Sequence, residues 1–362
     1  MRNKPDKTLF IIVVVLIFFG FFIFTSAAFG LLTKAGADFS VVVTKQLAVA
    51  VIMGMVGIFA VSSLHYKKWN RIAVIVFISS IIACALIFVP GLGFASGGAR
   101  RWLVLGPINV QPAEFLKFGT ILFLSHWYSK YKDKSSDIVY GLLPFIFTLG
   151  IAALLIIKQP DTGSFLVLAA AAFGIYIAAG APWKHIVSII LCGLLGLIIL
   201  ISVRPYMMQR IQSFIDPESD SLGASYQIRQ SLIAIGSGGI GGRGFGQSVQ
   251  KFNYLPESIG DSIFAVAGEE FGFIGSSILV LLFMGLGLRG MKIASDAPDP
   301  FSRLLATGIV ILITAQSFVN MGAMLGILPL TGVPLVFVSH GGTALLFAFV
   351  EVGILLNISK YT

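Results

Sequence analysis

Charge is what this sequence lacks most. Charged residues make up 11% of its 362 residues and apolar residues 57%, whereas an average soluble domain carries about 25% charge. So few charges cannot cover the surface of a water-soluble globule of this length. Soluble enzymes, disordered chains and secreted disulfide scaffolds are therefore excluded. The mean hydropathy of +0.94 indicates a membrane protein.

Cysteine is also scarce. Cys84 and Cys192 both lie in apolar stretches and are expected to be small buried hydrophobes. The apolar stretches run without alternation for about 18 to 25 residues, which excludes a transmembrane β-barrel. We predict an all-α polytopic membrane protein, with residues 1–362 forming a single integral membrane domain.

The apolar stretches predict ten transmembrane helices. Their expected ranges are 8–31, 46–64, 71–92, 113–128, 140–157, 163–181, 185–203, 262–288, 303–327 and 342–358. The first stretch is too long for the apolar part of a cleaved signal peptide, so we expect it to be retained. The segment 204–261, between the seventh and eighth helices, is too long for a simple turn.

The basic residues set the expected orientation. Lys and Arg at the ends of short loops favour a cytoplasmic location for those loops and for both termini, whereas half of the basic residues expected outside lie in the long loop 204–261. The net charge of +9 is explained by orientation and by anionic membrane lipids. We expect no nucleic-acid partner. The Gly-rich, charged segments 93–112 and 204–261 then face outward, and we expect the chemistry there.

The first outward motif joins the sequence GGARRW at 97–102 to QPAEFLK at 111–117. Arg100 and Arg101 are adjacent on the outer side, and the guanidinium fork binds phosphate groups well. Glu114 and Lys117 lie one helical turn apart and share a helix face. These residue types fit a diphosphate site beside the bilayer. A structural ion pair between Glu114 and Lys117 explains the same spacing equally well.

Two further outward motifs have structural explanations beside functional ones. Asp161, in the sequence KQPDTG, suits the N-cap of the following helix. The Gly-rich segment 236–246 contains a G-x-G-x-x-G match from Gly239 to Gly244, but no strand precedes it, so a Rossmann site is rejected. Its glycines allow sharp bends and a close approach to a ligand, although plain loop flexibility is an alternative.

Asp261 begins a long apolar helix at the outer interface, where it could serve as an N-cap, as a general base or as both. The segment 328–343 combines prolines and glycines within an apolar stretch, which indicates an irregular, re-entrant segment. It contains His340, whose ordinary pKa lies near neutrality. A hydrogen-bonding role in the bend is the simpler explanation for this histidine.

These motifs, in this order, resemble the SEDS family (shape, elongation, division and sporulation) of bacterial peptidoglycan polymerases. The resemblance runs from about residue 8 to 358. Its markers are GARRW at 98–102, QPAEFLK at 111–117, QPDTGS at 159–164, YLPE at 254–257 and LPLTGVPLVFVSHGG at 328–342. The segment 244–251 is more similar to FtsW, the division member, than to RodA, the elongation member.

The resemblance implies a ten-helix fold in the cytoplasmic membrane of a bacterium, with both termini cytoplasmic. It also implies polymerisation of lipid II into glycan strands on the extracytoplasmic face, and it assigns the catalytic carboxylate to Asp261. The chain departs from the family beside this residue, where Ile259 and Gly260 replace His-Thr and Ser262 replaces Phe. In the last motif, His340 stands where the family has Tyr.

The leading hypothesis is an inverting glycosyltransferase with undecaprenyl diphosphate as leaving group. We expect substrate contacts from Arg100, Arg101, Glu114, Lys117, Arg243, Lys251 and Glu257, and secondary or structural roles for Asp161, Gly239, Gly244, Ser339 and His340. A divalent cation (Mg²⁺ or Mn²⁺) would fit the chemistry, although no metal-ligand spacing is evident. Expected partners are a class B penicillin-binding protein of the FtsI type and other division proteins.

Two rival functions remain at this point. A lipid II flippase would use the intramembrane charges of Glu114, Lys117, Glu269 and Glu270 as a polar path. Against it, the polar motifs cluster on one face, and no internal repeat is evident. The other rival is a non-catalytic scaffold in a division complex. An elongation polymerase of the RodA type is the alternative within the same chemistry.

Overall fold

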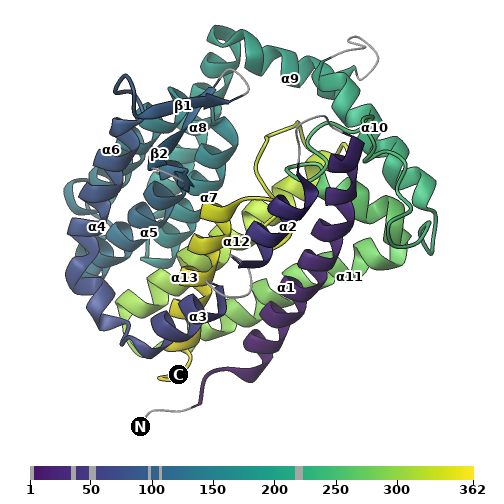
Figure 1. Ribbon diagram of the computed structural model, residues 1–362. Coiled ribbons are helices and arrows are strands. Elements are labelled where there is room, and N and C mark those ends of the chain that lie inside the picture. The colour runs from purple at the N-terminus through teal and green to yellow at the C-terminus, as the bar shows by residue number, and fades with distance from the viewer. Residues whose placement is uncertain (1–3, 34–37, 49–53, 97–98, 106–107, 217–222) are drawn as a thin grey trace.

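The computed structural model of the protein describes residues 4–33, 38–48, 54–96, 99–105, 108–216 and 223–362. Helices dominate these residues (Figure 1). The helices are α1 (Lys7–Ala28), α2 (Phe39–Leu47), α3 (Gly54–Ser63), α4 (Lys67–Leu86), α5 (Pro112–Lys130), α6 (Leu143–Ile157), α7 (Thr162–Ala178), α8 (Trp183–Val203), α9 (Pro205–Ile215), α10 (Ala224–Gly238), α11 (Ile263–Ser295), α12 (Pro300–Met324) and α13 (Gly342–Ile358).

Shorter elements complete the fold. The strands are β1 (Gly93–Ser96), β2 (Ala99–Leu105) and β3 (Ile108–Val110), and the single turns of 3₁₀ or π helix are η1 (Phe29–Thr33), η3 (Lys132–Lys134) and η4 (Ile138–Leu142). The strands form one antiparallel sheet in the order β1-β2-β3.

Helix α12 forms the centre of the bundle. It packs against α5, α7, α11 and α13, and most of its apolar residues are buried inside the protein. Helices α4 to α8 lie on one side of it, and α1, α10 and α11 lie on the other (Figure 1). The helix around which both groups pack is therefore well placed to carry polar side chains shared between them.

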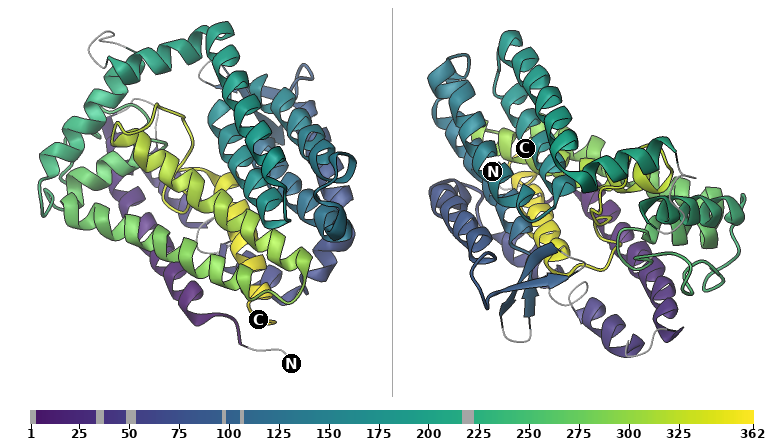
Figure 2. Two further views of the ribbon diagram at one scale, coloured as in Figure 1. Left: turned by 180° about the vertical axis from the view of Figure 1, so that it is seen from behind. Right: turned by 90° about the horizontal axis from the view of Figure 1, so that it is seen from above.

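Helix α9 connects the two groups at one end of the bundle. It packs against α8 and α10 and runs across the top of the molecule in both Figure 1 and the rear view of Figure 2. The sheet lies at this same end, whereas α1 begins and α13 ends at the opposite end (Figure 1). The long segments between helices thus gather at the end away from both termini.

Among the residues that the structure describes, six helical stretches are long and apolar enough to span a membrane: Lys7–Thr33, Lys67–Leu86, Ile138–Ile157, Trp183–Val203, Ile263–Ser295 and Pro300–Met324. Helices α3, α7 and α13 are apolar but shorter. The remaining predicted span, 113–128, corresponds to α5, whose first turns carry Glu114 and Lys117. The protein is a multi-pass membrane protein, and the count of ten spans stays a prediction.

Three details differ from the sequence prediction. The all-α prediction missed the three strands, because segments of three to seven residues are too short to show a clear alternation. The predicted helix 46–64 is described as the end of α2 and the whole of α3, and residues 49–53 between them lie outside the described part. The predicted loop 204–261 contains α9 and α10, so much of it is helical.

Candidate active site

Asp261 occupies a turn whose backbone is held from three sides. Asn320 of α12 donates from Nδ2 to the backbone oxygen of Asp261 (2.7 Å). Ser339 Oγ donates to the oxygen of Gly260 (2.7 Å), and the backbone N–H of His340 donates to the oxygen of Ile259 (2.8 Å). The turn that contains Asp261 and the segment 328–343 therefore meet, and the second holds the first in place.

The N-cap explanation of Asp261 is wrong. Helix α11 begins at Ile263, and its N-cap residue is Ser262. The Asp261 carboxylate instead accepts a hydrogen bond at Oδ1 from Nε2 of Gln227 (3.3 Å), a residue of α10 that also donates to Ser262 Oγ (2.9 Å). Because the Asp261 carboxylate does not cap the helix, it remains available to accept a proton from a substrate.

The surroundings of Asp261 suit a base that works near neutral pH. Burial raises its pKa to about 6, and the negative charge of Glu257 acts in the same direction. The hydrogen bond from Gln227 and the positive charge of Arg210 oppose this shift. A carboxylate whose pKa approaches the working pH is a stronger proton acceptor than an ordinary aspartate.

Arg210 of α9 brings a positive charge to Asp261. Its Nη1 donates to the backbone oxygen of Leu330 (3.0 Å). A Cβ atom built on Gly332 would lie 3.5 Å from Arg210 Nη2 and 3.8 Å from Asp261 Oδ2, so the guanidinium and the carboxylate border the same glycine. Gly332 has φ +70°, a conformation that favours glycine, and any side chain there would enter this space.

A second arginine joins the group from β2. Arg101 donates from Nε to the backbone oxygen of Gln159 (3.0 Å) and from Nη2 to that of Pro160. The charges of Arg101 and Asp161 both act on the Arg210 guanidinium. The side chain of Arg100, one residue earlier, is exposed. Of the two adjacent arginines, the structure brings Arg101 to the group around Asp261.

The N-cap prediction for Asp161 is confirmed. Asp161 Oδ1 accepts from the backbone N–H of Ser164 (3.2 Å) at the start of α7. The next residue, Thr162, bonds the Tyr206 hydroxyl of α9 (2.7 Å). Since Tyr206 lies one helical turn before Arg210, this contact fixes α9 in the position that aims Arg210 at Asp261.

Glu114 and Lys117 form an ion pair in the protein interior. Lys117 Nζ lies 2.8 Å from Glu114 Oε1, and the two residues are 1% and 5% exposed, respectively. Lys117 also donates to Gln316 Oε1 (2.7 Å), and Gln316 Nε2 donates to the backbone oxygen of Pro334 (3.0 Å). The pair thus supports the segment beside Asp261 from within, and its ammonium is already engaged by two partners.

The Gly-rich segment packs against a kink in α11. Gly272 interrupts this helix with φ +63°, and backbone bonds join the residues around it to Gly239 and Gly244. Lys251 is buried and pairs with Glu270 (2.7 Å), and Arg243 lies 3.5 Å from Glu269. These interactions hold the segment to α11, so the predicted substrate contacts of Lys251 and Arg243 are not among the residues gathered around Asp261. Gly97 and Gly98 of the first motif lie outside the described residues.

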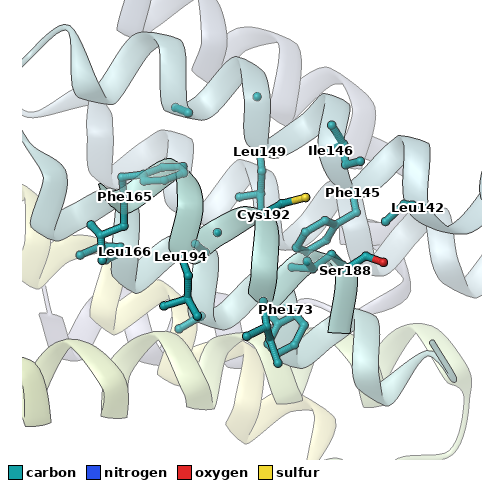
Figure 3. Close-up of a pocket in the computed structure, with 18 residues that line it drawn as sticks. Leu142, Phe145, Ile146, Leu149, Phe165, Leu166, Phe173, Ser188, Cys192 and Leu194 are labelled. Carbon is teal, nitrogen blue, oxygen red and sulfur yellow. The ribbon is translucent and has the colours of Figure 1, made fainter. Parts of the chain in front are cut away.

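A large groove on one side of the bundle is lined almost entirely by apolar side chains. A groove of about 610 Å³ between α6, α7 and α8 is lined by side chains such as Phe145, Phe165 and Leu194 (Figure 3). Ser188 and Cys192 are the lining residues whose side chains carry a hydroxyl or a thiol. No residue of α8 is buried. The groove shares no residue with the group around Asp261.

No group of three or more His, Cys, Asp or Glu side chains that could hold a metal ion occurs in the described part of the chain. Among the described residues, the charge of Glu257 acts on Asp261 and the charge of Asp161 acts on Arg210. The Asp161 carboxylate already caps helix α7.

Comparison with known proteins decides the family. Residues 6–362 match the family of FtsW, RodA and SpoVE, described as a cell cycle protein. The chain belongs to the FtsW/RodA/SpoVE family. The family resemblance inferred from the motifs is therefore confirmed.

Relatives within this family match over nearly their whole length. Stage V sporulation protein E of Bacillus subtilis (strain 168) is 36% identical over 361 residues, covering 100% of this chain and 98% of the relative. A probable peptidoglycan glycosyltransferase FtsW of Trichlorobacter lovleyi is 38% identical over 354 residues, covering 98% and 93%. The likeness extends to a sporulation protein as well as to FtsW proteins.

Solved structures show the same fold. A chain of a peptidoglycan synthase complex, described in terms of the structural coordination of polymerization and crosslinking, matches with a TM-score of 0.77 and 26% identity, covering 98% of both chains. The rod shape determining protein RodA of Thermus thermophilus matches with a TM-score of 0.72 and 26% identity, covering 98% of this chain and 97% of that one. The SEDS fold predicted from the sequence is confirmed.

Several residues of the site gave no signal in the sequence. Arg210 lies in the segment that was predicted to be a long loop, and no recognisable motif surrounds it. Gln227, Gln316 and Asn320 are single polar residues in helices. The one available clue was that Gln316 and Asn320 are spaced four apart in an apolar helix, which places both on one face.

Proposed function

We propose that this family member is a peptidoglycan glycosyltransferase that polymerises lipid II into glycan strands at the outer face of the bacterial cytoplasmic membrane, for septal wall synthesis in division. The observation that carries the proposal is the pairing of a partly buried Asp261, with a pKa of about 6, with Arg210 across Gly332. A base and a cation side by side are what a glycosyl transfer with a diphosphate leaving group requires.

In this mechanism Asp261 removes the proton from the 4-hydroxyl of the acceptor GlcNAc. The hydroxyl oxygen attacks the anomeric carbon of the donor with inversion, and the bond to undecaprenyl diphosphate breaks. Arg210 and Arg101 offset the negative charge that develops on the diphosphate, because guanidinium groups bind phosphate oxygens in a bidentate manner. Glu257 keeps Asp261 a strong base by opposing its ionisation.

Both termini are proposed to lie in the cytoplasm, with the end of the bundle that carries α9 and the sheet facing outward. A class B penicillin-binding protein of the FtsI type is the proposed partner that crosslinks the product. The active site is proposed to need no resident metal, and Mg²⁺ or Mn²⁺ would then act only by binding the diphosphate of the substrate.

The purified protein should convert lipid II into glycan strands, separated by length on a gel, and addition of the class B partner should increase the yield. The assay is run with Mg²⁺, with Mn²⁺ and with a chelator. Proteoliposomes carrying fluorescent lipid II test the flippase alternative in parallel. Transport of lipid II without strand formation, in the presence or absence of the partner, would reject the polymerase proposal.

The rate of polymerisation should depend on the protonation of Asp261. Since the carboxylate must be ionised to act as base, kcat/KM should rise with pH through about 6. The charge of Glu257 raises the pKa of Asp261, so Glu257→Gln should move this acid limb to lower pH. A pH–rate profile of both proteins provides the measurement, and an unmoved limb would exclude the proposed effect of Glu257.

The two adjacent arginines should behave differently. Arg101→Ala removes a charge near Arg210 and two bonds to the 159–160 backbone, and we expect a rate loss of about 10²-fold. Arg101→Lys should rescue poorly, because an ammonium cannot reproduce the fork. Arg100→Ala is the matched control and should retain most activity. Equal losses in both alanine variants would contradict the placement of Arg101 in the site.

A further inference from the structure

A second carboxylate joins the buried Glu114–Lys117 pair. Glu351 lies in the middle of α13 and is 4% exposed. It lines a small cavity of about 10 Å³ together with Glu114, Lys117 and Gln316. The other residues that line this cavity have apolar side chains. Glu351 is therefore a buried acidic residue that lines the same small cavity as the ion pair.

The described neighbours provide one positive charge for two carboxylates. Lys117 is engaged by Glu114 (2.8 Å) and by Gln316 (2.7 Å). Within the described residues Glu351 has no hydrogen bond and no ion pair within 4 Å, although the charges of Lys117 and Glu114 both act on it. Helix α3, which packs closely on α13, carries no titratable side chain, and α12 presents the neutral Gln316.

Full ionisation of this cluster would be costly. With both carboxylates charged, the cluster would carry a net negative charge in the membrane interior, where an unpaired charge is expensive. Two carboxyl groups that share one site can hold a single proton between them. One proton, added to the Lys117 ammonium, makes the cluster neutral.

A metal ion fits this cavity less well than a proton. Calcium takes six to eight oxygen ligands and magnesium keeps a near-octahedral shell, whereas the cavity volume is close to the minimum for a single water. The Lys117 ammonium also occupies the position from which it would repel a cation. A proton needs no additional ligand and no additional volume.

We propose that Glu351 and Glu114 share one proton beside Lys117, so that Glu351 is a proton-binding residue of the membrane interior and the reserve counter-ion of Lys117. When Glu114 is ionised, Glu351 carries the proton as a neutral acid. When the proton moves from Glu351 to Glu114, the Glu351 carboxylate balances the ammonium. The cluster stays neutral in both states, and through Gln316 it continues to hold the oxygen of Pro334.

Infrared spectroscopy would detect this proton directly. We compare the purified parent protein with Glu351→Gln and Glu114→Gln at pH 8, where Asp261 is mostly ionised. The parent should show a carboxylic acid C=O band, and each variant should lack it, because the remaining carboxylate then pairs with Lys117 as an anion. A band of equal intensity in the parent and both variants, or no band in the parent, would overturn the proposal.

Thermal unfolding in detergent tests the reserve role. Glu351→Gln and Glu114→Gln should each lower Tm only slightly. The double variant should lose far more than the sum of the two shifts, because Lys117 is left without a counter-ion. Adding Lys117→Met should restore folding, which keeps the test decisive if the double variant fails to fold. An additive double variant, or no recovery in the triple variant, would contradict the proposal. These measurements require no glycosyltransferase activity, so their outcome is separate from that of the proposed function.

Discussion

Asp261→Ala and Asp261→Asn should both abolish polymerisation of lipid II while leaving the protein folded in the membrane. Removal of a general base typically costs about 10² to 10⁴ in rate. The asparagine variant is the sharper test, because its side-chain oxygen can still accept the bond from Gln227 and the backbone bonds from Asn320 and Ser339 do not involve the carboxylate. The measurement is strand synthesis at matched membrane levels.

Thermal stability provides the control for this variant. Because the folded protein raises the pKa of Asp261 to about 6, it binds the proton more tightly than the unfolded chain does. The stabilisation from the protonated form is present below the ordinary aspartate pKa and is lost as pH rises through about 6. Asp261→Asn should therefore raise Tm relative to the parent at pH 8, and this advantage should vanish near pH 4. Full activity in Asp261→Asn would refute the assignment of the base.

The fold was predictable to the extent that its signals are long and repetitive. Apolar stretches such as 8–31 and 185–203 predict helices because every backbone N–H and C=O group within the bilayer must form a hydrogen bond inside the protein. The strand pair at 93–105 left no such signal, since four residues of β1 pair with β2 through a register shift between Phe94 and Ala95. Short elements depend on tertiary contacts that a sequence pattern does not contain.

The candidate site was predictable only in part, for a related reason. Asp261 was found because a motif surrounds it, and Asp161 because helix caps have a local pattern. Arg210 and Glu351 were missed because each is brought to its partners by packing between helices that lie far apart in the sequence. Lys251 stood in a motif as well, but its partner is Glu270, and a motif alone does not distinguish a substrate contact from a buried ion pair.

Substitution of Arg210 should have the second-largest effect on the reaction. Arg210 is half-buried, it borders Asp261 at Gly332, and α9 presents it from the segment that crosses between the two groups of helices. Its guanidinium is the cation best placed for a leaving diphosphate. Loss of one such electrostatic group typically costs about 10² to 10³ in rate, and we expect a loss of this size in Arg210→Ala.

Two comparisons separate this role from a structural one. Arg210→Lys should recover little activity, because a single ammonium cannot hold the oxygen of Leu330 and a phosphate oxygen in one plane. The pH–rate profile should also move, since the charge of Arg210 lowers the pKa of Asp261, and its removal should shift the acid limb to higher pH. Arg100→Ala, which removes an exposed positive charge outside the group around Asp261, is the matched control and should leave the acid limb in place. If Arg210→Ala lost activity with an unchanged acid limb, Arg210 would act only on the position of α9, and the electrostatic role proposed here would be wrong.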